Sequence, residues 1–255
     1  MHICLYHSTL ITTLDLVIIA YLSQKEIEES LNLLEKDWEV DPIIREFVLG
    51  KRKDVADHAV KVKDVVFHIP FLTGTRKFVL WKCYWPDCHN CCDRQGRLPL
   101  TSDDLIIIGK GLKYQKISDF IKKETILATW QEPGPSGQYT SMTTINLKRK
   151  EDETEADDGT HIPCRFLDDN GGCSMHPDRP GVCYLYPFST WLENEGGLAR
   201  VHATFQFTGD CPGFYLADNL DSMKDVLKEY SPIIYDYNMK SNRTMRESFG
   251  SVNFS

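Results

Sequence analysis

The sequence lacks any excess of positive charge. Its 255 residues contain 29 Lys and Arg against 37 Asp and Glu, which gives a formal net charge of −8. General nucleic-acid binding requires a basic surface that neutralises phosphates. We therefore expect no nucleic-acid partner, and the short basic run Lys51-Arg52-Lys53 does not change that expectation.

Long hydrophobic runs are also missing. The apolar stretch Leu10–Leu22 is interrupted by Asp15 and is too short to cross a bilayer. Residues Met1–His7 carry no Lys or Arg, unlike the start of a secretory signal. We therefore expect no transmembrane segment and a cytoplasmic location. Leu14–Tyr21 is expected to be a buried strand or a helix start, with a short membrane-associating anchor as the alternative.

Cysteine is too sparse for a disulfide-stapled scaffold, since there are nine cysteines in 255 residues. Eight of them nevertheless gather in one part of the chain: Cys83, Cys88, Cys91, Cys92, Cys164, Cys173, Cys183 and Cys211. In a reducing compartment such clustering favours metal ligation, with disulfides as the alternative. The isolated Cys4 is expected to be a small buried hydrophobe.

The chemistry of these thiols narrows the choice of metal. Thiolates suit zinc, copper(I) and iron–sulfur clusters, and they discriminate against magnesium and calcium. A structural zinc takes four ligands, commonly from two close pairs, and Cys88-x-x-Cys91 is such a pair. Cys83 lies a short loop further back and can reach the same site. We therefore predict that the eight cysteines hold zinc or an iron–sulfur cluster.

The adjacent pair Cys91-Cys92 leaves the number of sites open. Neighbouring side chains usually diverge, so either one thiol faces a second metal or only one of the two is a ligand. Eight thiols could build one four-iron cluster with spare ligands, two mononuclear sites or one bridged multinuclear site.

Other polar side chains near the cysteines could complete such a centre. Four thiolates around a divalent ion leave a net charge of about −2, which nearby cations must offset. The cations closest in the sequence are Lys82, Arg94, Arg97, Arg165 and Arg179, and the histidines that could join as ligands are His89, His161 and His176.

Caps and periodicity predict the local structure. Ser23 and Glu26 form a capping-box signature, and Asp41-Pro42 starts a helix that ends near Gly50. Helices are also expected from Thr101 or Ser102 to about Leu112, over Ile117–Glu124 and over about Asp221–Tyr230. Strands are expected over Phe78–Trp85, Thr125–Trp130, Tyr139–Leu147 and Leu198–Phe207. Val60–Phe71 is ambiguous, Asp168–Gly172 is a tight turn, and the acidic run Glu151–Asp158 is a solvated loop.

These elements predict an α+β fold. Short helices and a small antiparallel sheet are expected to surround a loop-rich cysteine metal centre. The predicted parts are a helical N-terminal region (1–79), a cysteine-cluster domain (80–215) and a C-terminal helix with a tail (216–255) that frays from Lys240.

The residues around the cysteines resemble a known family. The family pattern starts with the closely spaced cysteines Cys83–Cys92. It continues with Leu100-Thr101-Ser102-Asp103-Asp104, Cys164-Arg165-Phe166-Leu167, Cys173-Ser174-Met175-His176, Arg179-Pro180-Gly181-Val182-Cys183 and Pro187-Phe188. Over about Lys82–Gly213 the chain is similar to the YkgJ-like cysteine-cluster family, a zinc- or iron-chelating domain. It departs from that family in the longer gap from Cys83 to Cys88 and in Tyr184, which stands where an arginine is common.

The resemblance implies a metal-binding protein in a structural, redox-sensing or accessory role. A related cysteine cluster occurs in flagellin lysine N-methylase, so the alternative is an enzyme, either a redox catalyst or a protein methylase. No glycine-rich nucleotide loop follows a strand, which weakens the methylase alternative. Acid–base groups for an enzyme could come from Glu132, Asp178, His161 and His176. A third hypothesis is an oxygen or redox sensor that docks on a protein partner through its N-terminal helices.

Overall fold

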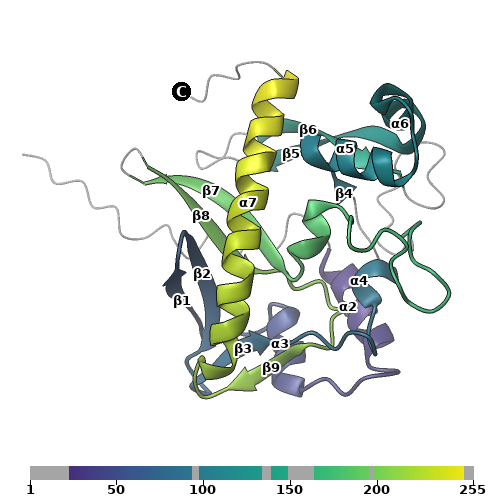
Figure 1. Cartoon of the computed structure of the whole chain (residues 1–255). Coiled ribbons are helices and arrows are strands. Elements are labelled where there is room, and N and C mark those ends of the chain that lie inside the picture. Colours follow the sequence, from purple (N-terminus) through teal and green to yellow (C-terminus); the bar gives the residue numbers. More distant parts are fainter. Residues whose placement is uncertain (1–22, 94–97, 134–138, 149–163, 196–197, 250–255) are drawn as a thin grey trace, which may run out of the picture.

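A curled six-stranded sheet forms the centre of the fold (Figure 1). The computed structural model of the chain describes residues 23–93, 98–133, 139–148, 164–195 and 198–249. The strand order in this main sheet is β7-β8-β2-β3-β9, and β1 pairs with β2. Its strands are β1 (Val55–Val62), β2 (Val65–Leu72), β3 (Lys77–Trp81), β7 (Phe188–Glu195), β8 (Leu198–Phe205) and β9 (Phe214–Ala217).

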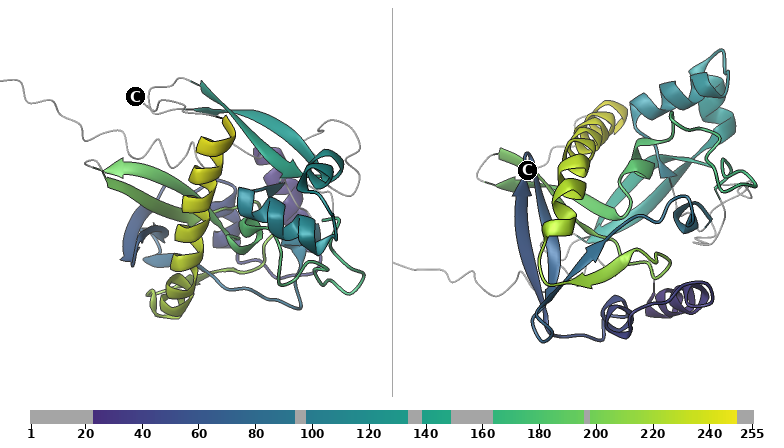
Figure 2. Two further views of the ribbon diagram at one scale, coloured as in Figure 1. Left: turned by 45° about the horizontal axis from the view of Figure 1, so that its top comes forward. Right: turned by 60° about the horizontal axis from the view of Figure 1, so that its bottom comes forward.

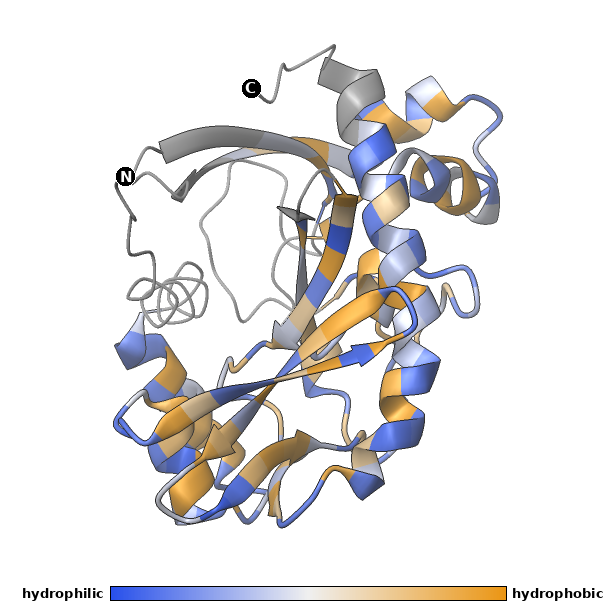
Figure 3. Cartoon of the chain, turned by 90° about the vertical axis from the view of Figure 1, so that its left-hand side faces the viewer, coloured by the Kyte–Doolittle hydropathy of each residue, from blue (hydrophilic) through white to orange (hydrophobic). Residues whose placement is uncertain are grey.

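One face of the main sheet packs on the long helix α7 (Lys224–Phe249). The sheet contributes Phe67, Phe188 and Phe205 to the main core, and the C-terminal segment contributes Leu227 and Ile234, all of them buried. Figure 3 shows hydrophobic residues gathered along the strands of this sheet. The burial of these large side chains is the main source of stability for the sheet–helix layer.

Helices α2 (Gln24–Leu34) and α3 (Pro42–Val48) also contribute buried side chains to the main core. Ile27 and Leu31 of α2 are buried, and the ring of Phe47 in α3 meets Phe207 edge to face with centroids 4.7 Å apart. The apolar side chains of α2 and α3 named here are therefore buried in the main core of the same chain.

A second layer holds the small antiparallel sheet β4-β6-β5. It consists of β4 (Leu98–Pro99), β5 (Thr125–Pro133) and β6 (Tyr139–Leu147), with α5 (Ser102–Gly111), α6 (Ile117–Glu124) and the short α4 (Asn90–Asp93) nearby. Its separate core contains Ile108, Phe120 and Leu147, together with Cys164 and Phe166. Figures 1 and 2 show α7 running along the main sheet and reaching α5 near its C-terminal end.

The α+β fold class is confirmed, as are the elements with clear local signals. Helix α2 has the predicted capping box at Ser23, α3 has its cap at Asp41, α5 is capped by Thr101, and α6 spans the predicted residues. The strands predicted over Phe78–Trp85, Thr125–Trp130, Tyr139–Leu147 and Leu198–Phe207 correspond to β3, β5, β6 and β8.

Three expectations require correction. The region 1–79, expected to be helical, is helical in its described part only as far as Val48, and the ambiguous stretch Val60–Phe71 belongs to the hairpin of β1 and β2. The small antiparallel sheet exists, but the main sheet is larger and contains the parallel pair β2–β8. The C-terminal helix extends to Phe249, so the tail from Lys240 is helical over most of its length.

Some predictions fall outside the described residues: those for Cys4, Leu14–Tyr21, Arg94, Arg97, Glu151–Asp158 and His161. Within the part that is described, no helix has both the length and the apolar character to cross a membrane.

Candidate metal centre

The main sheet delivers several cysteine segments to one region. Strand β1 pairs along the length of β2, so β3 and β8 share the opposite edge of β2. Because β3 runs antiparallel and β8 parallel to β2, their carboxyl ends approach each other along that edge. Cys83 follows β3, Cys211 lies between β8 and β9, and Cys183 precedes β7. Sheet topology thus brings together segments that are far apart in the sequence.

Four cysteines belong to the core of the small sheet, and we call them the first thiol set: Cys92, Cys164, Cys173 and Cys183. The backbone N–H of Cys164 donates to the carbonyl oxygen of Cys92 at 2.7 Å. The turn Asp168–Gly172 is confirmed, because Asp168 Oδ1 accepts from the N–H groups of Asn170 and Gly172, and this turn returns the chain to Cys173.

The pKa shifts of Cys164 and Cys183 reflect the nearness of the other thiols in the first set. Burial raises the pKa of Cys164 to about 11, and the charges of Cys92 and Cys173 add to the shift. Burial also raises the pKa of Cys183, with contributions from Cys164, Cys92 and Cys173. Cys183 therefore feels the charge of the other three thiols in the set, and Cys164 feels that of Cys92 and Cys173.

The other four cysteines that the structure describes are Cys83, Cys88, Cys91 and Cys211, and we call them the second thiol set. Cys211 packs against the main core, and its Sγ accepts from the Trp81 indole N–H at 3.3 Å and the Gly213 N–H at 3.4 Å. Burial raises the pKa of Cys211 to about 11, while these two donors oppose the shift. The Asn90 side chain donates to the Asp210 carbonyl at 2.8 Å, which ties the residue before Cys91 to the residue before Cys211.

The two sets meet at the adjacent pair Cys91-Cys92. A hydrogen bond between their thiols is the main reason that the pKa of Cys91 is raised, and the charge of Cys211 adds to it. Cys92 lies in the small-sheet core, whereas Cys91 is exposed and faces the charges of Cys211 and Asp210. The thiols of Cys91 and Cys92 thus contact each other, and this pair links the small-sheet core to Cys211.

The donors fit a thiophilic metal in their chemistry. Among the residues described by the structure, no three His, Cys, Asp or Glu side chains are arranged as a ready metal-binding group. Ligation would therefore require the sulfurs of a set to draw closer together.

The comparison with protein families bears on this cysteine-rich region. The sequence model of the family CxxCxxCC, described as "Putative zinc- or iron-chelating domain", matches residues 82–212. The chain belongs to this family. No match was found among curated proteins or among solved structures. The matched residues agree with the resemblance seen over Lys82–Gly213, while the narrower YkgJ-like grouping stays a prediction.

Cations near the thiols of the CxxCxxCC domain have separate partners. The Arg179 guanidinium lies 4.1 Å from the centroid of the Tyr184 ring, and its charge lowers the pKa of Cys183 against the effect of burial. Arg165 instead pairs with Glu124 at 2.6 Å, and Lys82 lies over the ring of Tyr84. Of these three cations, Arg179 is the one whose effect on a cysteine is seen directly.

Two of the three histidines predicted as ligands, His89 and His176, lie in the described part of the chain. His89 packs against the tight turn, since a Cβ at Gly171 would come within 2.9 Å of His89 Nδ1. His176 donates its backbone N–H to the Cys173 carbonyl at 3.0 Å. Both histidines therefore lie beside cysteine segments, and their role as ligands stays a prediction.

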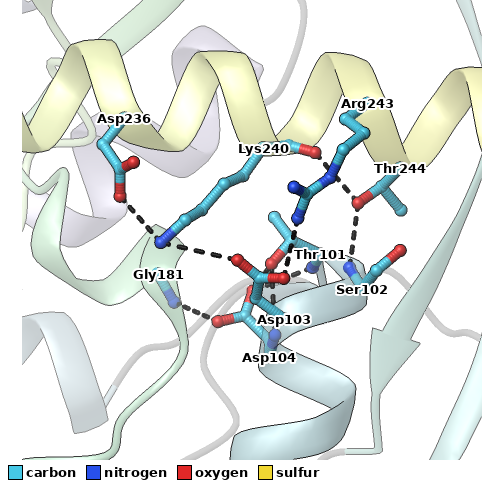
Figure 4. A network of polar contacts seen from close by, with 9 residues as sticks. All are labelled: Thr101, Ser102, Asp103, Asp104, Gly181, Asp236, Lys240, Arg243 and Thr244. Carbon is cyan, nitrogen blue, oxygen red and sulfur yellow. Dashed lines mark hydrogen bonds and ion pairs between the residues drawn. The ribbon is translucent and has the colours of Figure 1, made fainter.

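A buried carboxylate in the first turn of α5 also holds a cysteine loop (Figure 4). Asp104 Oδ2 accepts from the backbone N–H and the hydroxyl of Thr101, each at 2.8 Å. Its Oδ1 accepts from the Gly181 N–H at 2.9 Å. Gly181 lies two residues before Cys183, so Asp104 fixes both the start of α5 and the approach to Cys183.

Gly171 provides a test of the contact between the two cysteine loops. Its φ of +76° disfavours any L side chain, and a Cβ would also collide with His89. We expect Gly171→Ala to lower the free energy of unfolding by more than the about 1–3 kcal/mol of backbone strain alone. Gly50→Ala is the matched control, because Gly50 has a φ of +64° but no atom within 4 Å of the added Cβ. If urea unfolding showed an equal loss of unfolding free energy in Gly171→Ala and Gly50→Ala, the His89 contact would contribute nothing.

Proposed function

We propose that this chain is a cytoplasmic protein whose cysteines hold a zinc ion or an iron–sulfur cluster in a structural, redox-sensing or accessory role. The observation that carries the proposal is the first thiol set, in which three separate segments bring four thiols into one core. Individual cysteines are often buried as small hydrophobes, but packing alone gives no reason for four of them to gather.

Cys92, Cys164, Cys173 and Cys183 would be the ligands of the principal site. Cys83, Cys88, Cys91 and Cys211 would hold a second metal or complete a larger cluster, since Cys91 contacts both Cys92 of the first set and the charge of Cys211. When bound, zinc would couple its binding energy to the folding of these loops, and an iron–sulfur cluster would add electron transfer. Arg179 would offset thiolate charge beside Cys183, and the Trp81 and Gly213 donors would do so at Cys211.

The exposure of Cys83 favours a redox-sensing role over a purely structural one. Accessible thiolates oxidise more readily than buried ones. The enzymatic alternatives require an open coordination position, and docking of a partner on the N-terminal helices stays a prediction.

Anaerobic purification of the full chain tests the proposal. We expect at least one zinc or iron per chain by elemental analysis, with acid-labile sulfide and visible absorption if the metal is an iron–sulfur cluster. Protein that is folded by circular dichroism but colourless and free of both metals would contradict the proposal.

A further inference from the structure

Strand β1 lies at an outer edge of the main sheet (Figure 1). It pairs with β2 along its whole length on one side, and no described strand pairs with its other side. Its middle residues Asp57–Ala59 are exposed, and so is Lys61. An edge strand of this kind presents backbone N–H and C=O groups that a further strand can bind.

The hairpin register identifies which backbone groups face outward. Val62 and Val65 flank a two-residue turn and pair with each other. The pair that closes such a turn exchanges hydrogen bonds, and bonded pairs then alternate with non-bonded pairs along the two strands. Every second residue before Val62 therefore bonds to β2. The residues between them, Asp57, Ala59 and Lys61, direct their N–H and C=O groups away from β2, and we call these three residues the β1 edge.

Pro70 of β2 supports this assignment. It lies opposite Asp57 in the register, and proline has no N–H to donate. The Asp57–Pro70 pair therefore cannot exchange both hydrogen bonds of a bonded pair. Asp57 belongs to the outward-facing set, as the alternation from the turn requires.

The charges on the β1 edge are complementary to themselves. Asp57 and Lys61 lie four residues apart in one strand, so their side chains lie on the same face. If a second copy of β1 pairs antiparallel with Ala59 opposite Ala59, Asp57 of each copy lies opposite Lys61 of the other. This two-fold arrangement contains two cross-strand pairs of opposite charge, and such pairs stabilise a sheet.

Other two-fold registers of β1 fit less well. An axis through Asp57 or Lys61 would place like charges opposite each other, which destabilises strand pairing. An axis through Val60 would pair Asp57 with Lys63, which lies in the turn outside β1. An axis through His58 would place no lysine opposite Asp57.

The contacts around the β1 edge are compatible with this pairing. Asp57 Oδ2 lies 2.6 Å from His68 Nδ1, which restrains the carboxylate, and a carboxylate has a second oxygen that can accept from lysine. On the other face of the strand, half-buried Val60 of one copy would lie opposite exposed His58 of the other. Side chains approach most closely in such a non-bonded pair, so the contact covers apolar surface.

Strand β7, at another edge of the main sheet, lacks this complementarity. Its charged residues are acidic, Glu193 and Glu195 near its end, and it has no Lys or Arg. Two copies of β7 could therefore form no ion pair with each other. The charge pattern favours β1 as the edge that binds a second copy of the chain.

We infer that two copies of this chain pair antiparallel through their β1 edges, with Ala59 opposite Ala59, into one continuous sheet. The same surface serves both partners, as in other two-fold dimers. The contact consists of about six backbone hydrogen bonds and a few side chains, so it is small. We therefore expect a reversible dimer with a dissociation constant of about 10–100 µM. The inference goes beyond the proposed metal binding and does not depend on it.

Sedimentation of the full chain under reducing conditions tests the inference. The wild type should pass from monomer to dimer as its concentration rises through the expected dissociation constant. Lys61→Asp and Asp57→Lys should each weaken self-association at least about tenfold, because each places two pairs of like charges opposite each other. A mixture of these two variants should form heterodimers, since lysines of one would then face aspartates of the other. A mixture that stays monomeric, or a dimer that survives in both single variants, would overturn the inference.

Two further variants separate strand pairing from a general effect of charge. Lys53→Asp makes the same charge change at an exposed residue two positions before β1, and it should keep the wild-type dimer. Ala59→Pro removes an outward-facing N–H, a change that edge strands tolerate, and it should be folded by circular dichroism but monomeric. Equal loss of dimer in Lys53→Asp and Lys61→Asp would contradict the inference. If Ala59→Pro does not fold, sedimentation of the wild type still decides, because a wild type that stays monomeric well above the expected dissociation constant has no such interface.

Discussion

Cys183→Ser is expected to lose most of its bound metal and to destabilise the small-sheet region selectively. Cys183 approaches Cys92, Cys164 and Cys173 within one core, so its loss would remove one of the four ligands proposed for the principal site. Even the loss of a group that only supports a metal ligand weakens binding about 10- to 100-fold, so the loss of a ligand should cost more. Elemental analysis after dialysis against a chelator measures the effect.

Hydrogen exchange should show where the destabilisation occurs. Amides of α5, α6 and β6 should lose protection in Cys183→Ser, because metal binding is coupled to the folding of the segments that bear the ligands. Helices α2 and α3 should change little, because they belong to the main core. Cys4→Ser is the control for removing one thiol, and it should keep its metal. Equal metal content in the two variants would remove Cys183 from the ligand set.

Asp104→Asn is expected to destabilise the chain by about 1–3 kcal/mol, because an amide cannot accept at both of its ends. In the wild type, one oxygen of the buried carboxylate serves Thr101 and the other serves Gly181. The amide nitrogen of asparagine would face an N–H donor at one of these places. The same change should weaken metal retention about 10- to 100-fold, because Gly181 positions the loop that carries Cys183.

Asp103→Asn provides the matched control for this variant. Asp103 lies next to Asp104 in the same helical turn, but it makes partly exposed ion pairs with Arg243 at 2.8 Å and Lys240 at 3.6 Å (Figure 4). Such pairs contribute about 0–1 kcal/mol, so this variant should keep nearly all of its stability and metal. Urea unfolding and elemental analysis of the two variants compare them directly. Equal effects would show that the Gly181 contact is unimportant.

The sequence by itself predicted the features that depend on near neighbours. The caps at Ser23, Asp41 and Thr101 were found because each side chain bonds to a backbone N–H two or three residues away. The tight turn after Cys164 was found for the same reason. The cysteine pattern and the residues around it also predicted zinc or iron chelation, and the family match supports that expectation.

The main sheet could not be predicted in this way, because its pairing is not local. The stretch containing β2 gave no clear period, since it is buried along much of its length and lies between partners on both edges. Its parallel partner β8 follows it by more than a hundred residues. Strand β7 and the short β9 were missed because their pairing depends on neighbours in the sheet rather than on their own sequence.

Tertiary structure alone decided how the chemical groups are distributed. Adjacency in the sequence could not show that Cys92 joins the small-sheet core while Cys91 faces Cys211, because the direction of each side chain depends on the backbone that carries it. His68 and His202 gave no signal in the sequence, and they meet because β2 and β8 pair in parallel. The sequence determined which thiols the chain contains and which metals suit them. The sheet decided which thiols become neighbours, because it alone fixes the relative positions of segments that are far apart along the chain.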